Sequence, residues 1–141
     1  MKNCLVIGAG GIGLRHINIL KTLKYKVYLY ELNNLISNKL KKDNYIDEIF
    51  NNFNNINSFN FKFSIICSPS QTHLEYCKIL TKHKIPFLCE KPFSNSLSGL
   101  DKFNLVLKKS NIKSCVGLSL IHISEPTRPL YISYAVFCLK K

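Results

Sequence analysis

A glycine cluster near the start of the chain most constrains what it can fold into. Gly8, Gly10 and Gly13 form the pattern G-x-G-x-x-G. The cluster follows a short apolar run, 2–7, that is typical of a buried parallel strand. It opens a segment, 11–23, whose apolar residues recur at helical spacing. A strand, a glycine turn and a helix in this order form the context that a dinucleotide-binding turn requires.

Each residue of the glycine turn has an expected role. Gly8 permits the tight turn, Gly10 lets a pyrophosphate approach the backbone, and Gly13 lets the helix pack close to the strand. Gly11 and Ile12 lie at the helix start, where free amide groups and a partial positive charge favour an anionic ligand. We therefore expect these five residues to bind a dinucleotide, and a glycine-rich turn without a ligand is the alternative.

Strands and helices alternate along the rest of the chain. Apolar and β-branched runs predict strands at 26–30, 61–67, 87–89 and 113–116, and helical spacing predicts helices at 32–42, 72–82 and 96–109. Thr72 and Glu75 match a capping box, with Ser70 as a rival cap. The segment 43–60 is ambiguous, since its apolar residues fit a helix and its asparagines fit a loop. The alternation predicts one α/β domain, 1–117, with a Rossmann-like, doubly wound parallel sheet.

Glu31 ends the second predicted strand, 18 residues after Gly13. An acid at that place can accept hydrogen bonds from the hydroxyl groups of an adenosine ribose. It would also repel a 2′-phosphate, so we expect NAD as the cofactor rather than NADP. Lys39, Lys41 and Lys42 follow in the sequence and could favour NADP, and an exposed acid at a helix start is the structural alternative.

A second loop joins the predicted strand 61–67 to the helix after it. Cys67, Ser68 and Pro69 form this loop, and His73 lies in the helix that follows. In an open α/β sheet, loops at the carboxyl ends of the strands line the ligand crevice. We therefore expect the loop to contact the cofactor. His73 could face the cofactor or could be a histidine satisfied within its own helical turn.

Three patterns taken together resemble a known family. They are GxGxxGxxH from Gly8 to His16, SPxxxH from Ser68 to His73, and the triplet Glu90, Lys91 and Pro92 after the strand 87–89. They are similar to the Gfo/Idh/MocA family, which includes glucose–fructose oxidoreductase and inositol dehydrogenase, over about residues 2–117. A lysine at a strand end is commonly only solvent-exposed, and this resemblance gives it a role.

The resemblance implies an NAD(P)-dependent oxidoreductase that acts on a CH–OH group of a sugar, a polyol or a nucleotide-sugar-type substrate. It implies that Lys91 is the catalytic residue near the nicotinamide, that Glu90 and Pro92 also line the cofactor site, and that a cis bond precedes Pro92. It further implies a second α/β domain that carries an acid–base histidine and the contacts of a homo-oligomer. We expect that domain to be missing here and the fragment to be inactive alone.

Two other functions fit parts of the pattern. A non-catalytic dinucleotide-binding module that senses redox state or regulates a partner would also use the glycine turn. A flavoprotein could share Gly8 to Gly13 as well. Lys91 favours the enzyme, because a sensor has no need of a lysine beside the nicotinamide.

The composition bounds the partners. The net charge of +12 raises the possibility of nucleic acid, but 18 of the 20 basic residues are lysines spread along the chain, so we expect a solvated lysine surface and no nucleic-acid partner. No apolar run approaches the roughly 20 residues that span a bilayer. The apolar run at the start of the chain is also too short to be the hydrophobic core of a signal peptide. We expect a cytoplasmic protein without a membrane partner or a metal, whose six cysteines are buried thiols.

The segment 118–141 differs from the rest of the chain. All 15 asparagines lie at or before Asn111. Residues 118–128 and 132–139 can each be written as a translation of a transposase-type sequencing adapter, with three residues between them where a sample index would lie. We therefore expect 118–141 to be artefactual, with no site at His122 or Glu125, and the native chain to continue past Gly117. A genuine final strand and loop is the alternative.

Overall fold

The protein is described by a computed structural model that covers residues 1–95 and 98–117. The expectation of an artefactual tail lies outside these described residues. In chain order the elements are β1 (Asn3–Ile7), α1 (Gly11–Thr22), β2 (Lys26–Tyr30), α2 (Asn34–Lys42), β3 (Glu48–Ile49), the 3₁₀ helix η1 (Phe53–Phe59), β4 (Phe63–Ile66), α3 (Ser70–Lys82), β5 (Phe87–Cys89), α4 (Leu100–Ser110) and β6 (Ser114–Val116).

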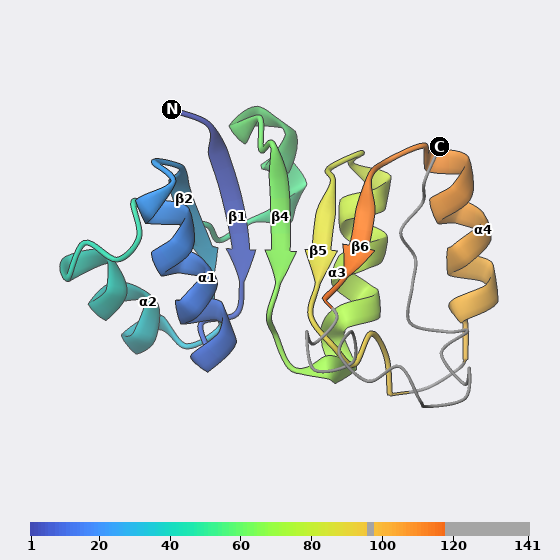
Figure 1. Ribbon diagram of the computed structural model, residues 1–141, viewed down its shortest axis with the longest axis horizontal. Coiled ribbons are helices and arrows are strands. Elements are labelled where there is room, and N and C mark those ends of the chain that lie inside the picture. Colours follow the sequence, from blue (N-terminus) through green and yellow to red (C-terminus); the bar gives the residue numbers. More distant parts are fainter. Residues whose placement is uncertain (96–97, 118–141) are drawn as a thin grey trace, which may run out of the picture.

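The strands form one parallel sheet in the order β3-β2-β1-β4-β5-β6. This is the strand order of a doubly wound dinucleotide-binding fold, in which the order reverses between β1 and β4. In Figure 1 the arrowheads of β1, β4, β5 and β6 point to the same edge of the sheet, where the chain turns toward α1 and α3. The predicted α/β fold is therefore confirmed.

Alternate residues of β1 serve two separate cores. Cys4 and Val6 belong to a cluster with Ile17 and Leu20 of α1, whereas Leu5 and Ile7 belong to a cluster with residues of α3 and α4. Successive side chains of a strand point to opposite faces of the sheet, so a strand buried on both faces is apolar throughout. This is why the run in β1 is continuous rather than alternating.

The segment 43–60 resolves into two short elements that the sequence left open. Strand β3 pairs with β2 through only two residues, and η1 follows it as a 3₁₀ helix rather than a loop or an α-helix. The carboxylate of Asp47 fixes this edge, because it accepts hydrogen bonds from the Val27 amide at 2.8 Å and the Lys21 ammonium at 2.9 Å. A strand of only two residues is too short to show the alternation of apolar and polar residues by which strands are recognised in a sequence. This is why β3 was not predicted.

Three helix starts differ from those predicted. Helix α2 begins at Asn34, because the side chain of Asn33 accepts the amides of Leu35 and Ile36. Helix α4 begins at Leu100 rather than at 96. The capping box at Thr72 is wrong, and so is Ser70 as the rival cap. Helix α3 begins at Ser70 after Pro69, with no side-chain cap.

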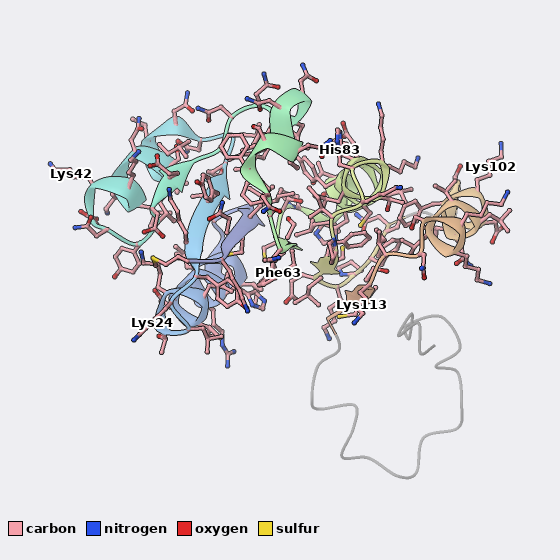
Figure 2. The ribbon with its side chains drawn as sticks, turned by 90° about the horizontal axis from the view of Figure 1, so that it is seen from above. Lys24, Lys42, Phe63, His83, Lys102 and Lys113 are labelled. Carbon is pink, nitrogen blue, oxygen red and sulfur yellow. The ribbon has the colours of Figure 1, made fainter. Side chains whose placement is uncertain are left out.

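The lysines and cysteines are placed as follows. Figure 2 shows the labelled lysines, Lys24, Lys42, Lys102 and Lys113, at separate points around the molecule. Cys4, Cys77 and Cys89 are buried thiols, whereas Cys67 is half-buried. The prediction of buried cysteines is therefore correct for only some of the described cysteines. Within the described ranges, no helix is both long and apolar enough to cross a membrane.

Candidate dinucleotide-binding site

The strand registers place several predicted site residues in one row. Ile7 is aligned with Tyr30 and with Ile66, and Ile66 is aligned with Cys89. The residues that follow these four are Gly8, Glu31, Cys67 and Glu90, so they lie side by side just beyond the carboxyl ends of the strands. Ligands of open α/β sheets bind at this edge, next to the point where the strand order reverses.

The glycine turn has the geometry that its pattern predicts. Gly8 has a φ of +93°, and a Cβ there would lie 2.8 Å from backbone atoms of Cys67 and Ser68. A Cβ on Gly13 would collide with the carbonyl oxygen of Gly8. Neither position tolerates a side chain, because one requires a conformation that suits glycine and both lie against backbone. The helix therefore packs as closely to β1 and β4 as the backbone allows.

The outer part of the turn is open. A Cβ on Gly10 or Gly11 would have no atom within 4 Å, and the Ile12 side chain is half exposed. Gly10 is the N-cap of α1, where no side chain bonds the helix amides and the first turn holds no acid. These amides and the helix dipole therefore face open space, in the arrangement that binds an anionic group.

Glu31 is tied to the glycine turn. Its carboxylate accepts a hydrogen bond from the Ala9 amide at 2.8 Å and another from the Asn33 amide at 3.0 Å. The side chain therefore lies beside the turn, at the end of β2, with a negative charge held in a fixed position. A carboxylate has further lone pairs, which can accept ribose hydroxyls.

The loop after β4 lies against the glycine turn. Cys67 and Ser68 are the backbone neighbours of Gly8, and Pro69 is exposed at the start of α3. Burial, with the charge of Glu90 and the thiol of Cys89, raises the pKa of Cys67 to about 12. The Cys67 thiol is therefore neutral, so it acts as a contact surface and not as a nucleophile.

His73 is buried beneath this loop. Its Nε2 lies 2.6 Å from the Ser68 carbonyl oxygen, and its Nδ1 lies 2.9 Å from the Pro92 carbonyl oxygen, both within hydrogen-bond distance. The side chain is 2% exposed. Both ring nitrogens are occupied by the protein backbone, so the geometry favours the satisfied-histidine alternative over a ring that faces the cofactor.

The turn after β5 is joined to the first helix. His16 of α1 bonds Glu90 between Nε2 and Oε1 at 2.8 Å, and a Cβ on Gly117 would lie 3.1 Å from the other carboxylate oxygen. The bond between Lys91 and Pro92 is cis, as the resemblance implied. Lys91 itself is exposed. This hydrogen bond therefore holds the residue before Lys91 against the helix that begins at the glycine turn.

His16 belongs to the GxGxxGxxH pattern, but its sequence position alone assigned it no role. The signal was present in the spacing, because His16 follows Gly13 by three residues and so lies on the same face of the helix. Its partner lies 74 residues away in Glu90, and no local pattern could have paired them.

A separate cavity of about 630 Å³ lies between α4 and the edge of the sheet. Aromatic and aliphatic side chains line it, including Phe87, Phe93, Phe103 and Leu107. Its lining does not include the glycine turn, Glu31 or Lys91. The groups suited to a dinucleotide therefore lie in the row at the carboxyl edge and not in this cavity.

The fold and the site define a class, the NAD-binding Rossmann domains. An uncapped helix start, an open glycine backbone and an acid at the end of β2 fit the pyrophosphate and the adenosine ribose of NAD. Residues 2–118 match the oxidoreductase family with an NAD-binding Rossmann fold that is named for Gfo, Idh and MocA. The chain belongs to this family, and NAD is its cofactor.

Solved structures share the fold. A probable dehydrogenase from Thermotoga maritima is 25% identical with a TM-score of 0.74, over 82% of this chain and 35% of that one. A scyllo-inositol dehydrogenase from Lactobacillus casei with bound NAD(H) and scyllo-inositol is 20% identical, with a TM-score of 0.73, over 83% and 36%. An oxidoreductase from Agrobacterium radiobacter in complex with NAD⁺, L-tartaric acid and magnesium is 19% identical, with a TM-score of 0.71, over 82% and 34%.

The match with these structures covers only part of them. The chain spans about a third of the length of each of the three. A comparison with the curated proteins gave no match.

Proposed function

We propose that this chain is the cofactor-binding part of an NAD-dependent dehydrogenase that oxidises a CH–OH group of a sugar or polyol, with Lys91 as its catalytic residue. The observation that carries the proposal is the hydrogen bond between His16 and Glu90. It joins the turn that contains Lys91 to the helix that begins at the glycine turn. The bond supports a site in which the turn carrying the cationic Lys91 lies beside the helix whose start would hold the pyrophosphate.

The residues divide the work of the site. The amides at the start of α1 hold the pyrophosphate, and Glu31 accepts the adenosine ribose hydroxyls. When bound, NAD supplies the hydride acceptor at its nicotinamide ring. The ammonium of Lys91 donates a hydrogen bond to the substrate oxygen and stabilises the negative charge that develops there as the hydride leaves. We place the group that accepts the hydroxyl proton outside this chain, in the part of the protein that its relatives have and the match does not cover.

The fragment should therefore bind NAD weakly and turn over no polyol. Proton transfer by a positioned group contributes about 10²–10⁴ in rate, and a one-walled site cannot fix the substrate. The Lactobacillus casei neighbour is described with scyllo-inositol, which supports a polyol as the substrate class. Oligomerisation of the full-length protein is part of the same proposal. A non-catalytic redox-sensing module would leave the exposed ammonium of Lys91 without a purpose.

Full-length enzyme carrying Lys91→Ala tests the catalytic role. We expect kcat for polyol oxidation to fall by about 10²–10³, because removal of one preorganised donor costs that much, while the Kd for NAD stays within about threefold, well under the roughly 1.4 kcal/mol of a tenfold change. Lys102→Ala, at an exposed lysine of α4, is the matched control and should change neither quantity. Unchanged turnover in Lys91→Ala would remove Lys91 from the mechanism.

A further inference from the structure

We propose that His73 is a positioning residue that acts as an imidazolium, tying the loop after β4 to the turn that carries Lys91. The proposal rests on the proposed function only in calling that turn the catalytic one. It concerns how the turn is held, and it assigns His73 no contact with substrate or cofactor.

The hydrogen bonds of the ring determine its charge. Both partners of His73, the Ser68 and Pro92 oxygens, are backbone carbonyls, which accept and cannot donate. A neutral imidazole carries one N–H, so it can donate to only one of them. Two donated bonds, at 2.6 and 2.9 Å, require both ring nitrogens to be protonated. The geometry therefore points to a buried cation.

A buried cation needs an anionic or strongly polar surrounding. Burial alone lowers the pKa of His73, but the sulfur of Cys89 and the two carbonyls outweigh it, so the pKa is raised. The pKa of Cys89 is lowered by the Cys77 thiol and by His73, against the effects of burial and of Glu90. Cys89, Cys77 and Glu90 are thus the titratable groups that bear on this ring, directly or through Cys89.

The placement of His73 explains why these bonds matter. The ring belongs to the first turn of α3, a helix anchored by buried Tyr76 and Cys77. Lys91 lies between two anchored neighbours, since His16 holds Glu90 before it and His73 holds the carbonyl of Pro92 after it. The residues on both sides of Lys91 are therefore tied to different helices, Glu90 through its carboxylate to α1 and Pro92 through its carbonyl oxygen to α3. Catalytic side chains need such support to keep their geometry.

The charge on the His73 ring makes the stability of the turn at Lys91 depend on pH. A group whose pKa is raised in the folded state stabilises the fold below its unfolded pKa, and the contribution is lost as pH rises through the folded value. For His73 the loss occurs above the usual range of histidine, when the ring gives up a proton and one of its two bonds. The turn at Lys91 should then loosen at alkaline pH.

NMR on the ¹⁵N-labelled 141-residue chain tests the charge directly. We expect both ring nitrogens of His73 to carry protons at pH 7 and to keep them above the usual titration range of histidine. His83 is the matched reference, because it is the C-cap of the same helix and its ring contacts only the side chain of Asn57 among the recorded bonds. A neutral His73 ring at pH 7 would overturn the proposal.

Amide exchange tests the positioning. In His73→Leu we expect protection of the Glu90 amide, which donates to the Ile66 carbonyl oxygen at 2.9 Å, to fall by about tenfold, the loss of a hydrogen bond to a charged group. In His73→Gln, whose amide can still donate, the fall should be smaller. His83→Leu should leave the Glu90 amide unchanged. Equal protection in His73→Leu and the parent would contradict the proposal. If His73→Leu does not fold, the ring measurement on the parent decides. Neither readout needs NAD, so a chain that fails to bind NAD would defeat the proposed function and leave this test intact.

Discussion

At the scale of single residues, a substitution at Gly10 should change ligand binding without changing the stability of the fold. The φ of −65° at Gly10 suits any L-residue, and a Cβ there would meet open space. Gly10→Val should therefore keep the fold, as circular dichroism can show, while NAD affinity falls by at least about tenfold through overlap with the pyrophosphate. Gly8 offers the contrast, because its positive φ and close backbone make any substitution structurally harmful. A Gly10→Val chain that binds NAD as tightly as the parent would show that the phosphate lies elsewhere.

Glu31 should decide between the two nicotinamide dinucleotides. Its charge is fixed beside the glycine turn by the amides of Ala9 and Asn33, so a 2′-phosphate would meet a like charge. We expect the parent to bind NAD more tightly than NADP. Glu31→Gln should narrow that ratio by roughly tenfold, about the effect of one close charge pair. Titration calorimetry with both dinucleotides measures it, with Asp43→Asn at the end of α2 as the control. Equal affinities in the parent would refute the assignment.

At the scale of elements, Asp47 holds the edge strand β3. Burial raises the pKa of Asp47, but the hydrogen bonds from Lys21 and the Val27 amide lower it more, so the net pKa lies below its usual value. Asp47→Asn should therefore cost about 1–2 kcal/mol of unfolding free energy at neutral pH. A lowered pKa gives stability that is present above the unfolded pKa and lost as pH falls through the folded one, so the difference between parent and variant should shrink in acid.

Urea unfolding at a series of pH values measures this difference. Glu48→Gln is the matched control, because its pairing with Lys41 at 2.7 Å is half exposed and should matter little. A loss in Asp47→Asn that is the same at pH 3 and pH 7 would show that the carboxylate charge is not the cause.

The elements also show where sequence reasoning stops. Continuous apolar runs and helical spacing were enough for β1, β2, α1 and the sheet class, because burial on two faces leaves a strong local signal. β3 was missed because two residues have no period. The pairings of Glu90 with His16 and of His73 with Pro92 were missed because they join residues far apart in the chain. The row of site residues could be predicted in outline, since parallel strands share one carboxyl edge.

At the scale of the molecule, the central claim is that this chain binds NAD at the carboxyl edge of its sheet. The most direct test is to titrate NAD into the ¹⁵N-labelled chain and to follow the amide signals. The account predicts saturable shifts centred on Ala9, Gly10 and Gly11 and extending to Ser68 and Lys91, with saturation in Gly10→Val only at NAD concentrations at least about tenfold higher. No saturable shift, or shifts centred on the cavity between α4 and the sheet, would contradict it.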